Sequence, residues 1–595
     1  MTDAMVRYRL RVLDAAAHLF EVQCRVMVGA GELSWSLPDW IPGSYMIRDF
    51  ARHVTELEAT LDGLALPCDK TAKSRWQAVA ARPGELCLRY QIYAWDLSVR
   101  GAHLDPTHAF FNGTSVFVSI GGHESEPHQM ELLPSDLLSE WRVATAMDPI
   151  ATCDRGFGVY QSKNYDELID HPVEMGTFER VHFDACGVPH EVILTGKYHA
   201  DLHRVCVDLK KICEAQIRFF GEPAPMKRYV FMVMVTGDGY GGLEHRASTA
   251  LMIGRDSLPM LGDEGVSDDY LKFLGLCSHE YFHTWNVKRI RPAEFVPFDL
   301  SREVHTRQLW VFEGITSYYD DLFLLRTGLI DSSRYLDLVA QTVTRVYRGE
   351  GRLKQSLSDS SFDAWTKFYK QDENAPNAIV SYYAKGMLVA MALDLVLRMR
   401  TDNRVGLDHV MQKLWREFLG GKEGIEDRHV ERVAEELCGS SLAEFFDVAV
   451  RGVDDLPLDE YLATHGVEMR WRAAVSSDDK GGALERGSAS GRAALGMQLS
   501  GPTKVGFVFR GGAAQVAGIS AGDEVVAWNG VRLNADVLKR QLKRHAPGDE
   551  VLLTVFRRDE LMELTVCLQS APLDTCSLST KEGREATRDA WLLNT

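Results

Sequence analysis

The sequence contains no long apolar run. Its longest apolar stretch, 387–393, ends at Asp394 and is far shorter than the roughly 20 residues that a bilayer-spanning helix needs. Residues 1–13 carry frequent charges, and no apolar segment follows a basic start, so we predict no secretory signal. We therefore expect a cytoplasmic protein that has no membrane partner.

Paired cysteines and excess positive charge are also missing. The 11 cysteines are odd in number and scattered singly, which favours a reducing compartment over a disulfide framework. The 66 lysines and arginines are outnumbered by 84 aspartates and glutamates, which gives a net charge of -18. Because such a field repels phosphate, we expect no nucleic-acid partner. The oligomeric state stays open.

The patterning of the 595 residues predicts a multidomain α+β protein. Alternating apolar residues predict a mostly β domain over 1–180. A mainly helical domain is expected over 181–475, because helical periodicity dominates after a helix at 202–220 and a buried strand at 229–235. A linker with a compact segment follows over 476–575, and 576–595 has the composition of a polar tail. The strands predicted in the first domain are 8–12, 20–28, 86–93 and 115–120.

One segment has the spacing of a metal site: Cys277-Ser-His-Glu-Tyr-Phe-His-Thr-Trp-Asn. His279 and His283 are four residues apart, so on a helix their side chains project from one face. Two imidazoles in that arrangement can chelate Zn²⁺, and Glu280 can reach water beside the metal. We expect a helix here, capped by Asp268 or Asp269. The alternative reading is a surface helix with unrelated histidines.

A catalytic zinc site needs a third protein ligand. The best candidate is Glu313, in a second helical segment that follows His283 after 29 intervening residues. Its apolar neighbours make an unpaired carboxylate costly, which favours a cationic partner over a solvated position. Gly314 costs about 1 kcal/mol within a helix, which is tolerable where backbones must pack closely.

The motifs His279-Glu-Tyr-Phe-His-Thr-Trp-Asn and Trp310-Val-Phe-Glu-Gly-Ile-Thr-Ser-Tyr-Tyr resemble those of the M61 peptidases, the glycyl aminopeptidase family. Trp40-Ile-Pro-Gly-Ser-Tyr also resembles M61 proteins, so the likeness covers nearly the whole chain. It implies a thermolysin-like, gluzincin catalytic domain with one zinc ion per chain. The 29-residue gap before Glu313 is longer than that in the related M1 enzymes and favours M61.

The segment Tyr240-Gly-Gly-Leu-Glu-His-Arg resembles the substrate-binding strand of gluzincin aminopeptidases. The resemblance implies that Glu244 binds the α-ammonium group of the substrate. A carboxylate in that place rewards a free N-terminus and leaves an internal peptide bond without a partner. Gly241 and Gly242 would permit close approach of the substrate backbone. An exposed acid after an ordinary Gly-Gly turn is the competing interpretation.

Ser381-Tyr-Tyr-Ala-Lys-Gly resembles the family element that supplies an oxyanion-stabilising tyrosine, which implies this role for Tyr383. Tyr382 is the adjacent competitor, and both rings could instead pack a helix start. The mechanism implied is metal-assisted hydrolysis with Glu280 as general base.

Residues 495–568 resemble a PDZ domain, chiefly through Gly511-Gly-Ala-Ala-Gln-Val-Ala-Gly-Ile-Ser-Ala-Gly-Asp and Asn529-Gly530, a strong hairpin signal. The resemblance makes Leu495, Gly496 and Met497 the loop that binds a peptide C-terminus. This loop departs from the usual Gly-Leu-Gly-Phe, so a purely structural role is an equal alternative.

Together these features predict a zinc aminopeptidase that cleaves the N-terminal bond of peptides. A preference for N-terminal Gly or Ala is implied by the family resemblance alone. Two other functions compete with it. One is a zinc endopeptidase to which the PDZ domain recruits substrates, and the other is a peptide-binding scaffold with a relict metal site.

Overall fold

The computed structural model describes residues 5–419, 423–483 and 492–594. It divides into two compact units. The first unit comprises Met1–Val304 and Phe418–Gly424, and the second comprises His305–Glu417 and Ile425–Thr595. Among the described residues, no helix combines the length and the apolar character needed to cross a membrane.

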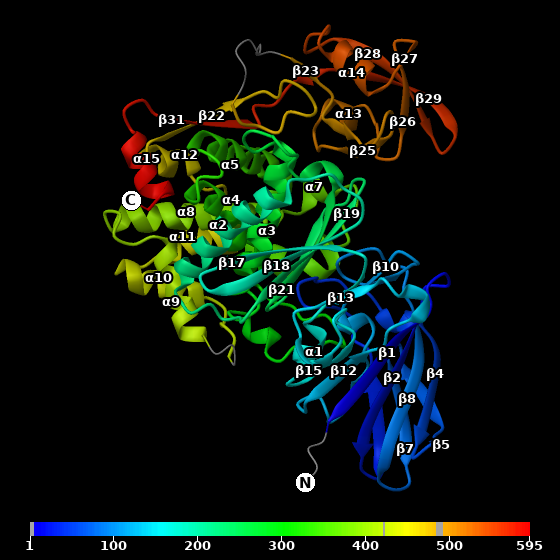
Figure 1. Ribbon diagram of the computed structural model, residues 1–595. Coiled ribbons are helices and arrows are strands. Elements are labelled where there is room, and N and C mark those ends of the chain that lie inside the picture. Colours follow the sequence, from blue (N-terminus) through cyan, green and yellow to red (C-terminus); the bar gives the residue numbers. More distant parts are fainter. Residues whose placement is uncertain (1–4, 420–422, 484–491, 595) are drawn as a thin grey trace. The chain divides into compact units, whose positions relative to one another are not determined.

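The first unit begins with a large β-sheet (Figure 1). Its strands are β1 (Val6–Asp14), β2 (Leu19–Val28), β4 (Val54–Leu61), β5 (Leu64–Ala65), β8 (Gly84–Tyr93), β12 (His128–Leu132), β14 (Asp148–Thr152) and β15 (Gly158–Ser162). They are ordered β14-β15-β12-β1-β2-β8-β4-β5. Every second side chain of β2 from Phe20 to Val28 is buried, because successive strand side chains point to opposite faces. The strands predicted at 8–12, 20–28 and 86–93 are confirmed.

Two smaller sheets complete this β-rich part. One contains β3 (Gly31–Ser36), β6 (Cys68–Ala72), β7 (Arg75–Ala80) and β11 (Ser119–Ile120) in the order β11-β3-β7-β6. The other contains β9 (Ala102–Leu104), β10 (His108–Phe111), β13 (Arg142–Ala144) and β16 (Val173–Gly176) in the order β13-β16-β10-β9, and the short helix α1 (Tyr165–Ile169) lies just before β16 in the chain.

The strand predicted over 115–120 is wrong except for its last two residues. The segment starts with a 3₁₀ turn at Gly113–Ser115 and continues as irregular backbone to β11. Its buried carbonyls are satisfied by tyrosines instead of a strand ladder: the Tyr90 hydroxyl donates to Val116 O at 2.9 Å and the Tyr8 hydroxyl donates to Val118 O at 2.7 Å. Buried backbone groups need a partner, and here side chains provide it.

A fourth sheet of the first unit carries the Gly-Gly-Leu-Glu motif. It consists of β17 (Glu179–Ala185), β18 (Val188–Thr195), β19 (Tyr229–Thr236), β20 (Gly241–Glu244) and β21 (Ser248–Gly254), in the order β17-β18-β19-β21-β20. Helices α2 (Leu202–Phe220) and α3 (Asp268–Phe282) pack against each other, and α3 also contacts β20 and β21. The helix predicted at 202–220 and the strand predicted at 229–235 are confirmed. β20 is one of the two edge strands and pairs antiparallel with β21.

The second unit is mainly helical before residue 467, as the periodicity predicts. Its helices are α4 (Ile315–Arg326), α5 (Ser332–Tyr347), α6 (Leu357–Phe362), α7 (Ala375–Ala378), α8 (Ala384–Arg400), α9 (Leu407–Phe418), α10 (His429–Cys438), α11 (Ala443–Phe446) and α12 (Leu458–Thr464). A π-helical turn at Trp310–Gly314 precedes α4. A Cβ atom on Gly314 would lie 2.5 Å from the Cα atom of Gly386 in α8, so this glycine allows the two backbones to touch.

Residues 493–570 form a small module with a hydrophobic core of its own. Its elements are β23 (Ala493–Ala494), β24 (Met497–Leu499), β25 (Val505–Val508), α13 (Ala513–Val516), β26 (Glu524–Trp528), β27 (Val531–Arg532), α14 (Ala535–Leu542), β28 (Glu550–Arg557), β29 (Glu560–Cys567) and β30 (Gln569–Ser570). Asn529 and Gly530 join β26 to β27 with φ angles of 48° and 77°. The predicted hairpin turn is confirmed, because both residue types tolerate the left-handed region.

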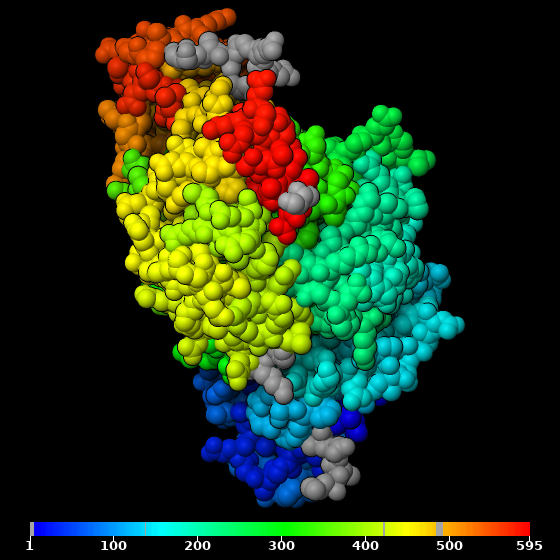
Figure 2. Space-filling view, turned by 90° about the vertical axis from the view of Figure 1, so that its left-hand side faces the viewer, coloured from blue at the N-terminus to red at the C-terminus, as the bar shows by residue number. Residues whose placement is uncertain are grey.

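The prediction of a polar tail over 576–595 is wrong. The segment contains β31 (Thr575–Thr580), which pairs with β22 (Val467–Arg472), and helix α15 (Glu585–Leu592). Trp591 of α15 is fully buried, and its indole N–H donates to the Tyr318 hydroxyl at 3.1 Å. Figure 2 shows this red segment lying against the yellow segments of the same unit. The few apolar residues of the segment fall on the side that packs, so an average over its composition hides them.

The described part of the predicted linker is anchored to the second unit. Asp479 accepts a hydrogen bond from Arg472 Nη2 at 3.0 Å, and Gly482 N donates to Cys576 O at 2.9 Å. The remainder of that prediction, residues 484–491, lies outside the described residues.

Candidate metal centre and substrate site

Helix α3 places His279 and His283 side by side. Their ring centroids are 4.7 Å apart, as expected for residues one helical turn from each other. The helix is capped by Ser267, whose hydroxyl accepts a hydrogen bond from Tyr270 N at 3.2 Å. The predicted caps, Asp268 and Asp269, are therefore wrong. Asp268 and Asp269 are the next two residues, in the first turn of the helix, where their negative charges interact favourably with the positive end of the helix dipole.

The turn after α3 orients one of the two imidazoles. His283 Nδ1 lies 2.8 Å from Asn286 O, and a ring nitrogen that faces a carbonyl must be the donor. The hydrogen therefore sits on Nδ1, which leaves the Nε2 lone pair for a metal ion, the usual arrangement of a metal-binding histidine. Asn286 belongs to the quoted motif, but its role was missed. The signal was its place in the turn directly after the second histidine.

Two buried glutamates lie close to His283. One ligand atom each from Glu244, Glu280 and His283 fall within 4.8 Å of one another. Glu280 is 5% exposed and Glu244 is 4% exposed. Glu244 Oε1 accepts no hydrogen bond from any described residue. Two carboxylates out of contact with water repel each other, so a pocket of this kind calls for positive charge.

Two glycines make room for these carboxylates. A Cβ atom on Gly242, in β20, would overlap the carboxylate of Glu280. A Cβ atom on Gly43 would lie 2.5 Å from both carboxylate oxygens of Glu244, and Gly43 has a φ of 97°, which disfavours any side chain. The sequence predicted that Gly242 lets substrate backbone approach closely, which stays a prediction, and it did not predict the Glu280 carboxylate here. The contribution of Gly43 was missed, although Pro42-Gly43-Ser44 is an evident turn signal.

Buried ionic contacts support the end of β20. Arg100 Nη2 donates to Gly242 O at 3.2 Å. Beyond Glu244, the backbone N–H of Arg246 donates to Asp170 at 3.0 Å, and Lys288 Nζ lies 2.7 Å from the same carboxylate. Although burial alone raises the pKa of Asp170, the charges of Lys288 and Arg246 lower it well below its usual value. The network fixes the strand that carries Glu244. Sequence analysis did not find it, because its members are far apart in the chain.

The second unit holds two further predicted site residues. Glu313 is 2% exposed and lies in the π-helical turn beside the buried Trp310 and Phe312. Tyr383 directly precedes α8 and is half-buried, whereas Tyr382 is fully buried. The Phe368 ring contacts both tyrosines, with centroid distances of 5.6 Å to Tyr383 and 4.8 Å to Tyr382. Of the two phenols, Tyr383 is therefore the more accessible.

The predicted carboxylate-binding loop lies at the start of β24. The Leu495 side chain is buried in the core of the module, so only its backbone is available to a ligand. Gly496 has a φ of 68°, and its carbonyl accepts from Phe509 N at 2.8 Å. Met497 pairs with Val508 of β25.

Comparisons with known proteins place the motifs in a family. Residues 7–177 match the peptidase M61 N-terminal domain, and residues 272–389 match the M61 glycyl aminopeptidase family. A crystal structure of an aminopeptidase N family protein from Idiomarina loihiensis is 40% identical, with a TM-score of 0.95, and the alignment covers 99% of this chain and 100% of that one.

More distant likenesses were also found. An M1 zinc metallopeptidase from Deinococcus radiodurans is 14% identical, with a TM-score of 0.48, and the match covers 76% of this chain and 95% of that one. No curated protein matches the chain.

The family likeness includes both the helix with the paired histidines and the β-rich part that contributes Gly43 and Arg100. With a relative that aligns over almost every residue, the conclusion extends to the whole chain: it belongs to the M61 peptidase family and is a metallopeptidase.

Proposed function

We propose that the chain is a zinc-dependent aminopeptidase that hydrolyses the N-terminal peptide bond of peptides. The observation that carries this proposal is the buried carboxylate of Glu244. One of its oxygens has no hydrogen-bond partner among the described residues, and it lies close to Glu280 and His283. A substrate α-ammonium group is the partner that satisfies it, whereas an internal peptide bond offers no positive charge there.

The residues fit a zinc ion. His279 and His283 supply adjacent imidazoles, and the Nδ1–H of His283 is already engaged by a carbonyl. In our proposal Glu313 supplies the third ligand, because a carboxylate buried among apolar side chains requires a cation or a donor. Two histidines and a glutamate are a common catalytic zinc set that leaves one position open. A zinc ion there supplies Lewis acidity toward water and the substrate carbonyl.

The protein side chains perform the proton transfers. Glu280 takes the proton of the attacking water and later delivers it to the leaving amine. Tyr383 donates a hydrogen bond to the carbonyl oxygen as negative charge develops on it. Glu244 holds the α-ammonium group, which sets the first peptide bond as the one that is cleaved. The preference for N-terminal Gly or Ala is part of the proposal and is supported by the description of the matching family.

We also propose that the module of residues 493–570 is a PDZ domain. Its confirmed Asn529–Gly530 hairpin and its separate core support this assignment. An endopeptidase served by this module remains the second candidate, and a non-catalytic scaffold is the third.

The first experiment compares glycyl-p-nitroanilide with its N-acetylated form, before and after chelation and after zinc is added back. We expect zinc-restored cleavage of the free-amine substrate alone. Equal cleavage of both substrates contradicts the aminopeptidase and leaves the endopeptidase. A zinc-loaded protein that cleaves neither these substrates nor longer peptides is a scaffold.

Replacing Glu280 with Gln tests the general base. The amide keeps the shape of the side chain but cannot take a proton, so we expect kcat to fall by about 1,000-fold. The zinc content, measured by elemental analysis, should stay at the wild-type level. A zinc-loaded Glu280→Gln protein with wild-type turnover disproves the assignment.

Replacing Glu244 with Gln tests the ammonium anchor. Loss of a charge-assisted hydrogen bond should lower kcat/KM for the free-amine substrate by about 10- to 100-fold, mostly through KM. Cleavage of the acetylated substrate should not fall, so the ratio of kcat/KM for the free-amine substrate to that for the acetylated substrate should decrease. If Glu244→Gln lowers both activities equally, Glu244 supports the site without binding the substrate N-terminus.

A further inference from the structure

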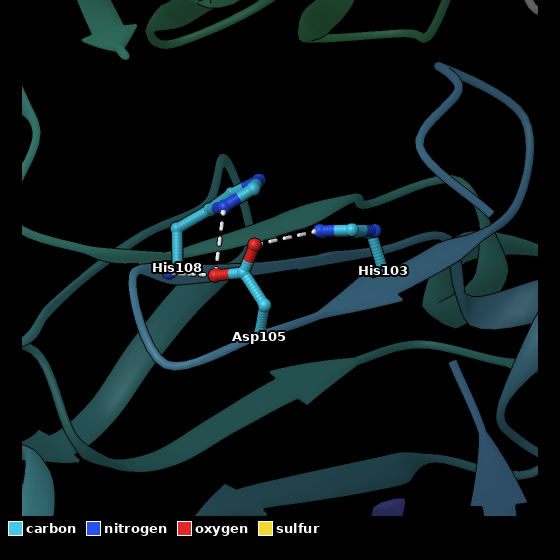
Figure 3. Close-up of side chains that lie close together, drawn as sticks. All are labelled: His103, Asp105 and His108. Atoms are coloured by element: carbon cyan, nitrogen blue, oxygen red, sulfur yellow. Dashed lines mark hydrogen bonds and ion pairs between the residues drawn. The ribbon is translucent and has the colours of Figure 1, made fainter. Parts of the chain in front are cut away.

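A second group of potential metal ligands lies in the β-rich part of the first unit. His103 is in β9, His108 begins β10, and Asp105 lies in the turn between them. One ligand atom from each lies within 4.8 Å of the others. Figure 3 shows the Asp105 carboxylate between the two imidazole rings, with one oxygen facing each ring.

The carboxylate of Asp105 is held by its own turn. Oδ1 accepts hydrogen bonds from Thr107 N at 2.6 Å, from the Thr107 hydroxyl at 2.5 Å and from His108 N at 3.1 Å. Oδ2 accepts a hydrogen bond from His103 Nε2 at 3.3 Å. His108 Nδ1 lies 3.8 Å from Oδ1, so each oxygen faces one ring and Oδ1 is also fixed by the turn.

Both imidazoles are buried and incompletely hydrogen-bonded. His103 is 3% exposed and His108 is 4% exposed. His103 Nδ1 and His108 Nε2 have no hydrogen-bond partner among the described residues. Each ring faces Asp105 with its other nitrogen, His103 Nε2 or His108 Nδ1. Buried polar atoms normally have partners, so two buried imidazoles that each keep one nitrogen unpaired around a shared carboxylate indicate a place for a ligand. The Asp105 side chain is 24% exposed and opens the group to water.

The types of side chain suit a cation. Two imidazoles and one carboxylate converge here, and these are the donors that zinc and its neighbours among the transition metals bind.

A purely structural explanation also exists. The rings of His18, Trp95, His103 and His108 form a stack, with successive centroid distances of 3.9, 4.9 and 4.9 Å. Stacking accounts for the packing of these rings, but it leaves the two nitrogens unpaired.

We propose that His103, Asp105 and His108 bind a second divalent cation of the zinc class, independently of the candidate centre on α3. Three protein ligands leave a further position for water. The site would bind its ion on the β9–β10 turn and take no part in peptide hydrolysis.

The test is a count of bound zinc. Metal-free wild-type protein is dialysed against Zn²⁺, and zinc per chain is measured by elemental analysis. We expect two ions in the wild type, one in His103→Gln/His108→Gln and one in His279→Gln/His283→Gln. His18→Gln is the matched control, since it removes the outer ring of the stack and leaves the three ligands, and should retain two. Asp105→Asn keeps an acceptor for the turn and should weaken binding about 10- to 100-fold.

Each outcome is distinguishable from failure of the proposed function. Wild-type protein with a single zinc that is lost only in His279→Gln/His283→Gln overturns this proposal and leaves the catalytic centre intact. A single zinc that is lost only in His103→Gln/His108→Gln supports the site on the β9–β10 turn and contradicts the proposed catalytic centre. If the double variant fails to fold, anomalous diffraction at the zinc edge from wild-type crystals decides: density between His103 and His108 supports the site, and its absence overturns it.

Discussion

Gly241 and Gly242 are adjacent in β20, yet an added methyl group would meet different surroundings at the two positions. At Gly242 it would overlap the carboxylate of Glu280, whereas at Gly241 it would lie 3.6 Å from Arg100 Nη1, an ordinary contact. The absence of a side chain at Gly242 therefore determines where the carboxylate of Glu280, the proposed general base, can lie.

Gly242→Ala should accordingly impair catalysis without removing the metal. Displacing Glu280 by about 1 Å should lower kcat about 100-fold, because proton transfer depends steeply on position. Zinc content and thermal stability should stay close to those of the wild type. Gly241→Ala is the matched control and should retain turnover. Equal, small effects of the two substitutions would show that Glu280 adapts to the methyl group.

At this scale the sequence predicted the residues with a local signature. His279, Glu280 and His283 follow from helical spacing, whereas the Gly-Gly pair predicted close approach of substrate backbone and not the Glu280 carboxylate that lies beside Gly242. Gly43 and Asn286 did not follow, because their importance depends on what the folded chain brings next to them. The spacing of residues predicts which side chains share a face of one helix or strand. It does not predict contacts between residues that are far apart in the chain.

At the scale of elements, Asp170 joins α1, the end of β20 and the turn after α3. Asp170 is 7% exposed and contacts Arg246 and Lys288. Lys288 is also buried, with 6% of its surface exposed. Removing one member of a buried ion pair leaves the other charge buried without a partner. This costs more stability than the loss of an exposed ion pair.

Asp170→Asn should lower the free energy of unfolding by about 3 kcal/mol at pH 7. The folded-state pKa of Asp170 lies below its unfolded value of 3.8, so its contribution is present above that value and is lost as the pH falls further. Urea unfolding between pH 7 and pH 3 should show the gap between wild type and variant shrinking only below about pH 4. Asp166→Asn is the control: Asp166 also pairs with Arg246, but its side chain is 43% exposed, so it should cost less than about 1 kcal/mol. Similar losses in both variants would refute the special role of the buried acid.

Elements with clean periodicity were predicted well, and α2 has the predicted bounds. The errors arose where side chains replace backbone partners, as at 115–120, or where a few apolar residues carry the packing, as in α15. Composition cannot report either case, because both depend on distant tyrosines: Tyr90 for the first and Tyr318 for the second.

At the scale of the whole molecule, the module is built into the second unit. Asn377 donates to Val508 O and accepts from Arg510 N, both at 2.9 Å. A cavity of about 600 Å³ opens between the helices and the module. Its lining includes Phe507 and Phe509 of the module and Phe368, whose ring contacts Tyr383. Charged side chains such as Arg348 and Arg352 also line it, so the cavity is of mixed polarity. If Tyr383 contacts the cleaved bond as proposed, the remaining residues of a peptide have this cavity in which to lie.

This arrangement predicts a dependence on substrate length. Replacing Phe507 and Phe509 with Ala should raise KM for a peptide of eight or more residues by about 10-fold, because each aromatic ring contributes about 0.5 to 1 kcal/mol of contact and the pair about 1 to 2 kcal/mol. Hydrolysis of glycyl-p-nitroanilide, which is too short to reach these rings, should stay unchanged. Phe556→Ala is the control, since this ring lies on β28 away from the cavity lining. An equal loss on both substrates would assign the module a structural role. No loss on either would place the peptide chain elsewhere.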